Sequence, residues 1–327
     1  MKLRILAFAA AISLTACGEP HGTAIRVIVP KGSSFARATD SLRKAGLVSA
    51  PLLFRVYARI RGDDRNIKPG TYLIKRGTPW PDIIRALNGG HGLVNTITIP
   101  EGWTLSQIVP LLAQTIAVPR DSVDAAVRDT AVRARLGVPT PTLEGYLFPD
   151  TYAFPVGTTA REAVSEMVKR FEREWKPDWS ARLGGLGMTR HEVVTLASIV
   201  EREARKAEER PVIAAVYRNR MHAGMLLQAD PTVQFASGKH TPRVMLKDLE
   251  IDSPYNTYKH PGLPPGPIAS PGGPSLVAAV FPANVSYLYF VAHPDGHHEF
   301  RNTLAEHERA KEMVRKEAAA LQQALPR

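Results

Sequence analysis

The sequence predicts a mixed α+β fold. Short runs of β-forming residues alternate with stretches in which apolar residues recur at helical spacing, and this alternation is too irregular for a doubly wound parallel sheet. Pro and Gly are frequent between Pro254 and Pro274, which predicts ordered loops there. With 327 residues, the chain is long enough for two or three domains.

The first part of the chain repeats one local pattern, a β-rich run followed by a Gly-containing turn and an amphipathic helix. Gly permits the turn, and Ser or Thr caps the helix by accepting a free backbone N–H. The expected strands cover residues 25–29, 72–74 and 94–99, and the expected helices cover about 34–45, 51–61, 79–88 and 104–115. We therefore predict an N-terminal α+β domain at 24–95 and a connecting segment at 96–139.

The second part of the chain is predicted to form one larger domain over 140–323. Thr189 and Glu192 have the spacing of a capping box and predict the start of a helix. Further helices are expected at 159–175, 209–223 and 303–323, and strands at 285–292 and 298–300.

The N-terminus has the features of an export signal, a positive start followed by the apolar run Ile5–Ala16. As a helix this run is about 18 Å long, short of a hydrocarbon core of roughly 30 Å. The run Leu14–Cys17 resembles a bacterial lipobox, so we predict a signal peptide at 1–16 and lipidation of Cys17; a membrane-spanning helix is the alternative. Cys17 is the single cysteine, so no disulfide is expected.

The chain is basic, with a formal net charge of +11, which favours anionic partners such as lipid headgroups or acidic wall peptides. No helix-turn-helix, zinc knuckle or aromatic-basic RNA motif is present, and the export signal argues against nucleic acid. Four histidines near Glu299 do not have the spacing of a zinc-binding helix, so no metal is predicted.

Two carboxylates stand out in the helix that follows Thr189. At 100° per residue, Glu201 falls within an apolar arc and Glu203 lies about 160° away, so the two cannot serve one cleft. The side chains expected on the solvent-facing side are Thr195, Ser198 and Arg202. An apolar surround favours the protonated form of a carboxyl group, the form required of a proton donor in glycosidic cleavage. An ion pair with Arg202 or Arg205 is the purely structural alternative, and periodicity does not choose between the two glutamates.

Five sequence blocks resemble the endolytic murein transglycosylase (YceG-like) family over about residues 25–315. They occur in this order: Leu143–Tyr152, Ala197–Glu203, Leu227–Val233, Tyr255–Tyr258 and Gly262–Ile268. The resemblance implies a lytic transglycosylase whose acid/base is the first Glu of its block, Glu201, with Glu203 structural. It implies cleavage between MurNAc and GlcNAc within glycan strands, giving 1,6-anhydroMurNAc ends and ending nascent strands. No cofactor or metal is implied, because the substrate supplies the nucleophile.

Amide and phenol side chains in the other blocks suit sugar recognition, since amides pair with N-acetyl or hydroxyl groups and phenol rings stack on sugar faces. A structural role for each remains open. The predicted substrate-binding residues are Glu144, Tyr146, Gln228, Asp230, Tyr255, Asn256 and Tyr258. We expect the Gly262–Pro267 run to form a stiff loop. The segment Ile99–Val109 resembles a LysM motif, a small βα unit associated with aminosugar polymers.

The resemblance places the protein in the cell envelope, on the inner membrane with its catalytic domain on the periplasmic side. It implies peptidoglycan glycan strands as substrate and peptidoglycan synthases as partners. The membrane attachment is either a lipid at Cys17 or an N-terminal helix. Two alternatives stay open: a noncatalytic glycan-binding lipoprotein, and a hydrolytic muramidase that uses Glu144 or Asp230 as its second carboxylate.

Overall fold

The computed structural model describes residues 24–238 and 244–324, and the chain divides into two compact units. Unit 1 contains the described residues up to Thr96 together with Ala153–Gly157, and unit 2 contains Ile97–Tyr152 and the chain from Thr158 onward. The predicted connecting segment 96–139 thus belongs almost wholly to unit 2. The predicted signal peptide and Cys17 lie outside the described residues.

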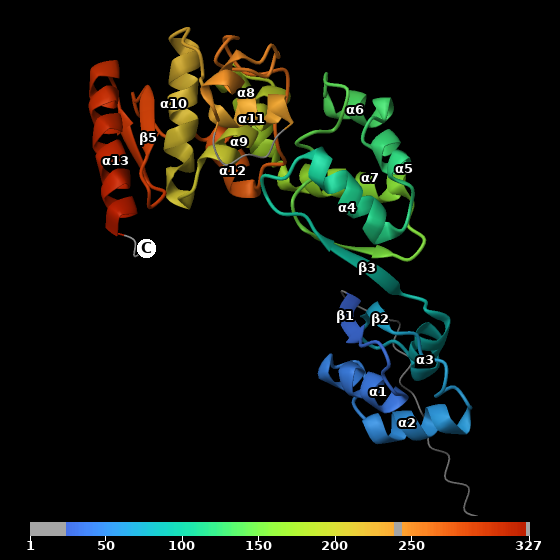
Figure 1. Ribbon diagram of the computed structural model, residues 1–327. Coiled ribbons are helices and arrows are strands. Elements are labelled where there is room, and N and C mark those ends of the chain that lie inside the picture. Colours follow the sequence, from blue (N-terminus) through green and yellow to red (C-terminus); the bar gives the residue numbers. More distant parts are fainter. Residues whose placement is uncertain (1–23, 239–243, 325–327) are drawn as a thin grey trace, which may run out of the picture. The chain divides into compact units, whose positions relative to one another are not determined.

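A four-stranded sheet has the order β1-β2-β3-β4 (Figure 1). Its strands are β1 (Ala24–Val29), β2 (Gly70–Lys75), β3 (Leu93–Thr98) and β4 (Thr151–Pro155). β1 pairs antiparallel with β2, and β2 pairs antiparallel with β3. The first three strands confirm the sequence prediction. β4 was not predicted, because it begins within the motif block that ends at Tyr152.

Three helices complete unit 1, and all three were predicted: α1 (Phe35–Lys44), α2 (Pro51–Ile60) and α3 (Trp80–Gly89). Their aromatic side chains join in the core, where the Phe35 and Phe54 rings stack at 5.5 Å and Trp80 meets Phe54 edge-on at 5.5 Å. Gly32 and Gly77 precede α1 and α3 with φ of 74° and 75°, a conformation that glycine adopts without strain.

Unit 2 begins with α4 (Leu105–Ile116), α5 (Arg120–Ala126), α6 (Thr130–Leu136), α7 (Ala160–Glu174) and α8 (Pro177–Leu186). α5 packs against both α4 and α7. α4 and α7 confirm the predicted helices. The other three were not predicted, because they are short or contain Pro and Gly, which weaken the periodic signal.

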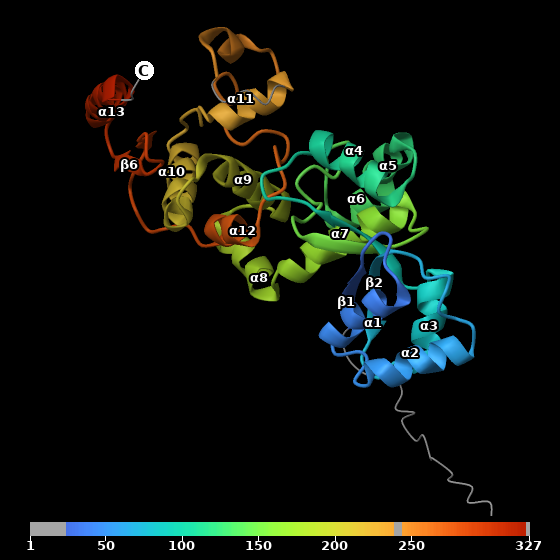
Figure 2. The ribbon, with the colours of Figure 1, turned by 60° about the horizontal axis from the view of Figure 1, so that its bottom comes forward.

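The second group of helices surrounds α9 (Arg190–Glu203), which packs against α10 (Arg210–His222), α11 (Asp230–Ser237) and α12 (Gly273–Val280) (Figure 2). Two short 3₁₀ turns cover Ala207–Glu209 and Leu246–Glu250. The hairpin of β5 (Tyr289–Ala292) and β6 (His298–Arg301) packs against α13 (Leu304–Ala324). Residues 251–272 contain neither helix nor strand, as predicted.

α9 is buried on every side from Val193 to Val200. The expectation of a solvent-facing side was therefore wrong for Thr195 and Ser198, which are 1% and 0% exposed. Both are buried without loss of hydrogen bonding, because Thr195 Oγ1 donates to the His191 carbonyl at 2.8 Å and Ser198 Oγ donates to the Thr195 carbonyl at 2.7 Å. The predicted capping box is confirmed: Thr189 Oγ1 accepts from the Glu192 N–H, and the Glu192 carboxylate accepts from the Thr189 N–H.

No helix among residues 24–238 and 244–324 combines the length and the apolar character needed to span a bilayer. The longest of them, α13, carries charged residues from Glu306 to Glu317.

Two motif blocks pack tightly at Gly145. Its φ of 81° favours glycine, and a Cβ there would lie 2.3 Å from Pro267 Cβ and 3.3 Å from the Ala269 carbonyl. We expect Gly145→Ala to lower the free energy of unfolding by more than 2 kcal/mol, as an order of magnitude, because backbone strain adds to overpacking. Chemical denaturation of the purified protein measures the change.

Gly137→Ala is the matched control. Gly137 has φ of 69°, but nothing lies within 4 Å of an added Cβ, so this variant reports strain alone. Equal losses for the two variants would contradict a tight contact between the two blocks.

Candidate active site

A cavity of about 590 Å³ lies in unit 2 where α9 ends. α9, α10, the segment before α11, β5 and α13 all contribute to its wall. The residues that line it include Glu203, Tyr217, Arg220, Gln228, Asp230, Tyr258, Tyr289, His298, His307, Glu308 and Lys311. Carboxylates, cations and phenol rings therefore face one space.

Glu203, the last residue of α9, reaches this cavity from a partly buried position. Tyr217 on α10 donates its O–H to Glu203 Oε1 at 2.7 Å, and Tyr217 itself is 1% exposed. The pKa of Glu203 is raised to about 7, mainly by burial; the nearby Asp230 charge contributes to the rise, and the Tyr217 hydrogen bond opposes it. The carboxyl group is therefore present in both protonation states near neutral pH.

Three of the predicted substrate-binding residues line the same cavity: Gln228, Asp230 and Tyr258. Tyr258 donates its O–H to Asp230 Oδ1 at 2.6 Å. Gln228 has φ of 51°, unusual for a residue with a side chain, and its N–H donates to the Thr257 carbonyl at 3.1 Å. Its side chain is exposed beside Glu203. Strained backbone of this kind is concentrated at functional sites.

Arg220, on α10, holds part of the cavity wall in place. Its Nε donates to the Leu288 carbonyl at 2.6 Å and its Nη1 to the Leu227 carbonyl at 2.7 Å. Its guanidinium lies 5.2 Å from the centre of the Tyr289 ring. Because Arg220 is 7% exposed and joins three segments, it stabilises the wall as well as supplying positive charge.

Glu201 has a different environment. Its Oε2 accepts the Gly272 N–H at 2.9 Å, and its Oε1 lies 3.4 Å from Arg210 Nη2. The side chain is 6% exposed and is not among the residues that line the 590 Å³ cavity. The neighbouring Glu101 has its pKa raised by burial and by the Glu201 charge. These contacts attach the end of α9 to the first residue of α10 and to the residue that caps α12.

Two other predicted binding residues are buried. Both oxygens of Glu144 accept the N–H of Leu105, the first residue of α4, at 3.0 and 3.1 Å, and burial raises the Glu144 pKa to about 8. Tyr146 is fully buried, with its ring edge-on to Phe171 at 5.0 Å and its O–H 2.9 Å from His191 Nδ1. Neither side chain lines the Glu203 cavity.

The remaining two belong to the loop between α11 and α12. Asn256 is fully buried and donates from Nδ2 to the carbonyls of Leu249 and Ile251 at 2.8 and 2.9 Å. Tyr255 is partly buried and packs on the Phe235 ring at 4.9 Å. These contacts close the loop on itself, and neither residue lines the Glu203 cavity.

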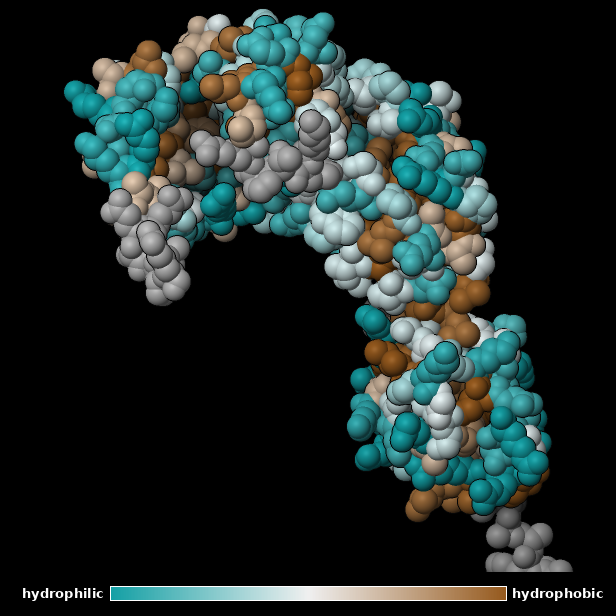
Figure 3. Space-filling view, in the orientation of Figure 1, coloured by the Kyte–Doolittle hydropathy of each residue, from teal (hydrophilic) through white to brown (hydrophobic). Residues whose placement is uncertain are grey.

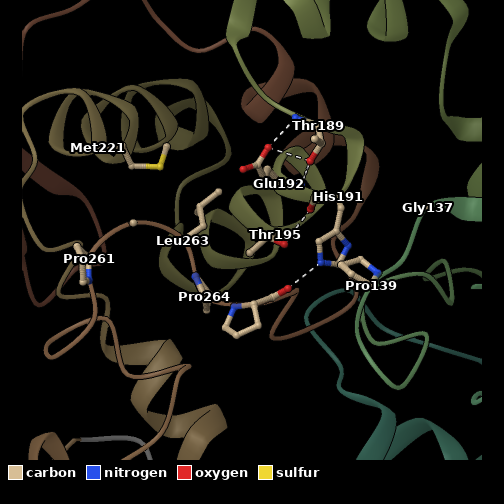
Figure 4. A pocket seen from close by; sticks show the side chains of 12 residues that line it. Gly137, Pro139, Thr189, His191, Glu192, Thr195, Met221, Pro261, Leu263 and Pro264 are labelled. Atoms are coloured by element: carbon tan, nitrogen blue, oxygen red, sulfur yellow. Dashed lines mark hydrogen bonds between the residues drawn. The ribbon is translucent and has the colours of Figure 1, made fainter.

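A second cavity of about 580 Å³ lies at the N-terminal half of α9 (Figure 4). The run Pro261–Pro265 forms one wall, in accord with the stiff loop expected from the sequence. His191 Nε2 lies 2.9 Å from the Pro265 carbonyl, and Ser198 Oγ accepts the Ile268 N–H at 3.0 Å. Burial lowers the His191 pKa, so neutral His191 donates from Nε2 and accepts from Tyr146 O–H at Nδ1.

Several side chains of the Glu203 cavity could not be found from the sequence. Tyr217 and Arg220 lie within an amphipathic helix where their spacing indicates only packing, and the α13 residues are distant in sequence. His298 is one of the four histidines near Glu299 for which no metal was predicted. Its Nδ1 lies 2.6 Å from Glu209 Oε2. Over residues 24–238 and 244–324, no three His, Cys, Asp or Glu side chains converge as metal ligands.

Comparisons with known proteins agree with this architecture. The model of the YceG-like family matches residues 27–313. An endolytic murein transglycosylase of Bacillus subtilis is 35% identical, and the match covers 89% of this chain and 84% of that protein. An endolytic murein transglycosylase of Streptococcus pneumoniae is 32% identical over 87% of this chain and 57% of that protein.

A solved structure is also similar. The crystal structure of a YceG-like protein from Listeria monocytogenes has a TM-score of 0.63 and 33% sequence identity, over 88% of this chain and 98% of that one. The fold described above is thus that of a class of α+β protein whose named members are endolytic murein transglycosylases. This chain belongs to the YceG-like family.

The buried Glu144 carboxyl predicts a pH dependence of stability. Its pKa rises from 4.5 to about 8 on folding, so its contribution is fully present below pH of about 4.5 and is lost as the pH rises toward 8. We expect the free energy of unfolding of Glu144→Gln, which keeps an acceptor oxygen for the Leu105 N–H, to change less with pH over this range than that of the wild type. Denaturation at several pH values measures this, and parallel curves for the two proteins would contradict it.

Proposed function

We propose that this chain is an endolytic murein transglycosylase, which cuts within the glycan strands of the bacterial cell wall. The observation that carries the proposal is the match of the YceG-like family model to residues 27–313, and the 590 Å³ cavity that Glu203 lines at the end of α9 offers it a site. Two relatives at 35% and 32% identity over most of the chain have this activity in their names.

We propose Glu203 as the acid/base from its place in the cavity; Glu201, which the family resemblance implies for this role, is the competing candidate. Glu203 lines the cavity together with Gln228, Asp230 and Tyr258, whereas Glu201 faces Gly272 and Arg210. A proton donor needs access to its substrate and a pKa near the working pH, and Glu203 has both. If Glu203 has this role, Glu201 is a positioning residue that fixes the last turn of α9 through Gly272 and Arg210.

The proposed reaction has two proton transfers by one group. Glu203 first gives its proton to the oxygen that links MurNAc to GlcNAc, and the bond from that oxygen to C1 breaks. The resulting carboxylate then takes the proton of the C6 hydroxyl of MurNAc as this oxygen bonds to C1. The product has a 1,6-anhydro end, the proton returns to Glu203, and no water is consumed. A group with a pKa near 7 can perform both transfers at neutral pH.

The other cavity residues suit sugar recognition. Gln228 offers an amide to N-acetyl or hydroxyl groups, and Asp230 accepts from Tyr258, leaving further acceptor capacity for sugar hydroxyls. We assign Glu144, Tyr146 and Asn256 structural roles because they are buried in hydrogen bonds elsewhere. Tyr255 stays a candidate at the edge of its loop.

The position in the cell is proposed from the sequence. We propose removal of residues 1–16, lipidation of Cys17 and attachment to the inner membrane with the enzyme on the periplasmic side. Peptidoglycan synthases are the proposed partners, and termination of nascent strands the proposed role. The LysM-like segment Ile99–Val109 spans the turn at Gly102 and the start of α4, and we propose that it serves packing rather than glycan binding.

Two isosteric variants test the assignment. We expect Glu203→Gln to lower cleavage of purified cell wall at least about a hundredfold, because the proton donor is removed. Glu201→Gln keeps the shape of the side chain and should retain measurable cleavage. Mass spectrometry of the products from the wild type should find anhydro ends.

Three results would count against the proposal. Loss of cleavage in Glu201→Gln alone would return the acid/base role to Glu201. Reducing ends in place of anhydro ends would indicate a hydrolase. An intact wall after treatment with the folded wild-type protein would indicate a glycan-binding protein without this activity.

Tyr217→Phe gives a pH signature. The lost hydroxyl lowers the pKa of Glu203 in the wild type, so its removal raises that pKa and keeps the acid form to higher pH. We expect the alkaline limb of kcat/KM to move to higher pH, with a loss of rate far smaller than in Glu203→Gln.

Tyr152→Phe is the matched control for this shift. Tyr152 is a buried phenol that donates to the Phe148 carbonyl at 2.6 Å and does not line the cavity. Removal of the Tyr152 hydroxyl should leave the pH profile of kcat/KM unchanged. A shift to lower pH in Tyr217→Phe, or the same shift in both variants, would contradict the role given to Tyr217.

A further inference from the structure

One helix of unit 1 exposes an apolar face. Four large apolar residues of α2 are 55–81% exposed: Leu52, Leu53, Val56 and Ile60. At 100° per residue they fall within an arc of about 100° on the helix. Figure 3 shows the corresponding hydrophobic surface where Figure 1 labels α2. We call these four side chains the α2 apolar face.

The α2 apolar face is not required by the core of unit 1. Phe54 and Ala58 project from the other side of the same helix and are fully buried in that core. α2 packs on the core through one side and exposes leucine, valine and isoleucine on the other, so unit 1 leaves its second apolar side uncovered. A cluster of exposed large apolar side chains commonly marks an interaction site.

Arginines border this face. On the helix, Arg55 and Arg59 follow one edge of the arc, and the Arg59 side chain is 85% exposed with Asp64 as a distant partner at 3.7 Å. Arg61 directly follows the helix and lies 5.6 Å from the Tyr57 ring. Residues 51–65 contain four arginines against two aspartates. An apolar stripe bordered by cations is typical of a helix that lies in the interface of a membrane with anionic lipids.

The distance along the chain points to the same surface. Only residues 18–23 separate Cys17 from Ala24, where β1 begins. Seven residue steps span at most about 25 Å. This step rests on the proposed lipidation of Cys17; with that lipid in the bilayer, the first residue of β1 stays within this distance of the headgroups.

We propose that α2 docks on the membrane surface, with the α2 apolar face at the level of the lipid headgroups and Arg59 against anionic lipid. The helix has only 10 residues, so it supplements the N-terminal anchor and does not replace it. Docking through a second contact fixes which side of unit 1 faces the bilayer. The alternative occupants, a second copy of this chain or another protein, are outcomes of the test.

Lipid quenching tests the proposal on the full chain reconstituted in vesicles. A fluorescent thiol label is placed on Leu53→Cys, and the vesicles contain lipids with a quenching group in the headgroup region. The matched control is Val156→Cys, an apolar residue of unit 1 that is 64% exposed. The wild type, whose single cysteine is Cys17, gives the background. We expect several times more quenching at position 53 than at position 156.

Two further variants separate the apolar contribution to docking from the electrostatic one. Replacing all four residues of the α2 apolar face by serine in an otherwise unchanged chain should leave thermal unfolding in place, because the residues are exposed. With the label at Arg65→Cys, a position that is 88% exposed just beyond α2, this variant should lose the quenching seen with the wild-type face. Arg59→Glu should weaken quenching by roughly tenfold in vesicles with phosphatidylglycerol, and much less in pure phosphatidylcholine.

Each contrary result has a distinct meaning. Equal quenching at positions 53 and 156 in vesicle-bound protein overturns the docking but leaves the anchor intact. A chain that does not sediment with vesicles counts against both. A concentration-dependent dimer without vesicles, abolished by the serine variant, assigns the face to a second copy instead. Wall cleavage by the same preparation, measured separately, shows whether the proposed enzyme function stands.

Discussion

The burial of α9 from Val193 to Val200 is the constraint on which unit 2 depends. Because this stretch is covered on every side, the turn that follows it cannot shift without disturbing α10 and α12, and that turn carries both glutamates. Glu201 attaches the turn to Arg210 and Gly272, and Tyr217 contacts Glu203 from the same helix α10. The direction of the Glu203 carboxyl is therefore set by the packing of two helices rather than by a loop.

This placement explains how one carboxyl group can suffice for the proposed chemistry. Burial beside Asp230 disfavours the charged form of Glu203, while the Tyr217 hydroxyl stabilises it. The two influences oppose each other and leave the pKa near the middle of the physiological range. Since the nucleophile in a lytic reaction comes from the sugar, the protein has only to exchange a proton and to hold the strand in position.

Much of the fold could be predicted from local sequence. Long amphipathic helices with Ser, Thr or Pro at their starts were predicted closely, as were the strands before Gly turns. Short helices with Pro and Gly, such as α8 and α12, were missed because periodicity needs more residues than they contain. The helical wheel separated Glu201 from Glu203 but misjudged Thr195 and Ser198, since their hydroxyls bond to carbonyls one turn earlier and need no water.

The candidate site was harder to predict than the fold. Gln228, Asp230 and Tyr258 lie on one cavity because a loop returns to the start of α11, and no local pattern encodes that return. Glu144 and Tyr146 have the same chemical types but serve α4 and His191 inside the core. The two glutamates are separated by one residue, and only the structure shows which of them lines this cavity.

The place of α13 in the wall has a consequence for biogenesis. His307, Glu308 and Lys311 close one side of the space beside Glu203, and they come from the element that follows all its other walls in the chain. A chain in which α13 has not yet docked therefore has Glu203 in place without the enclosure around it. The cavity is complete only once the last helix of the fold has joined the earlier ones.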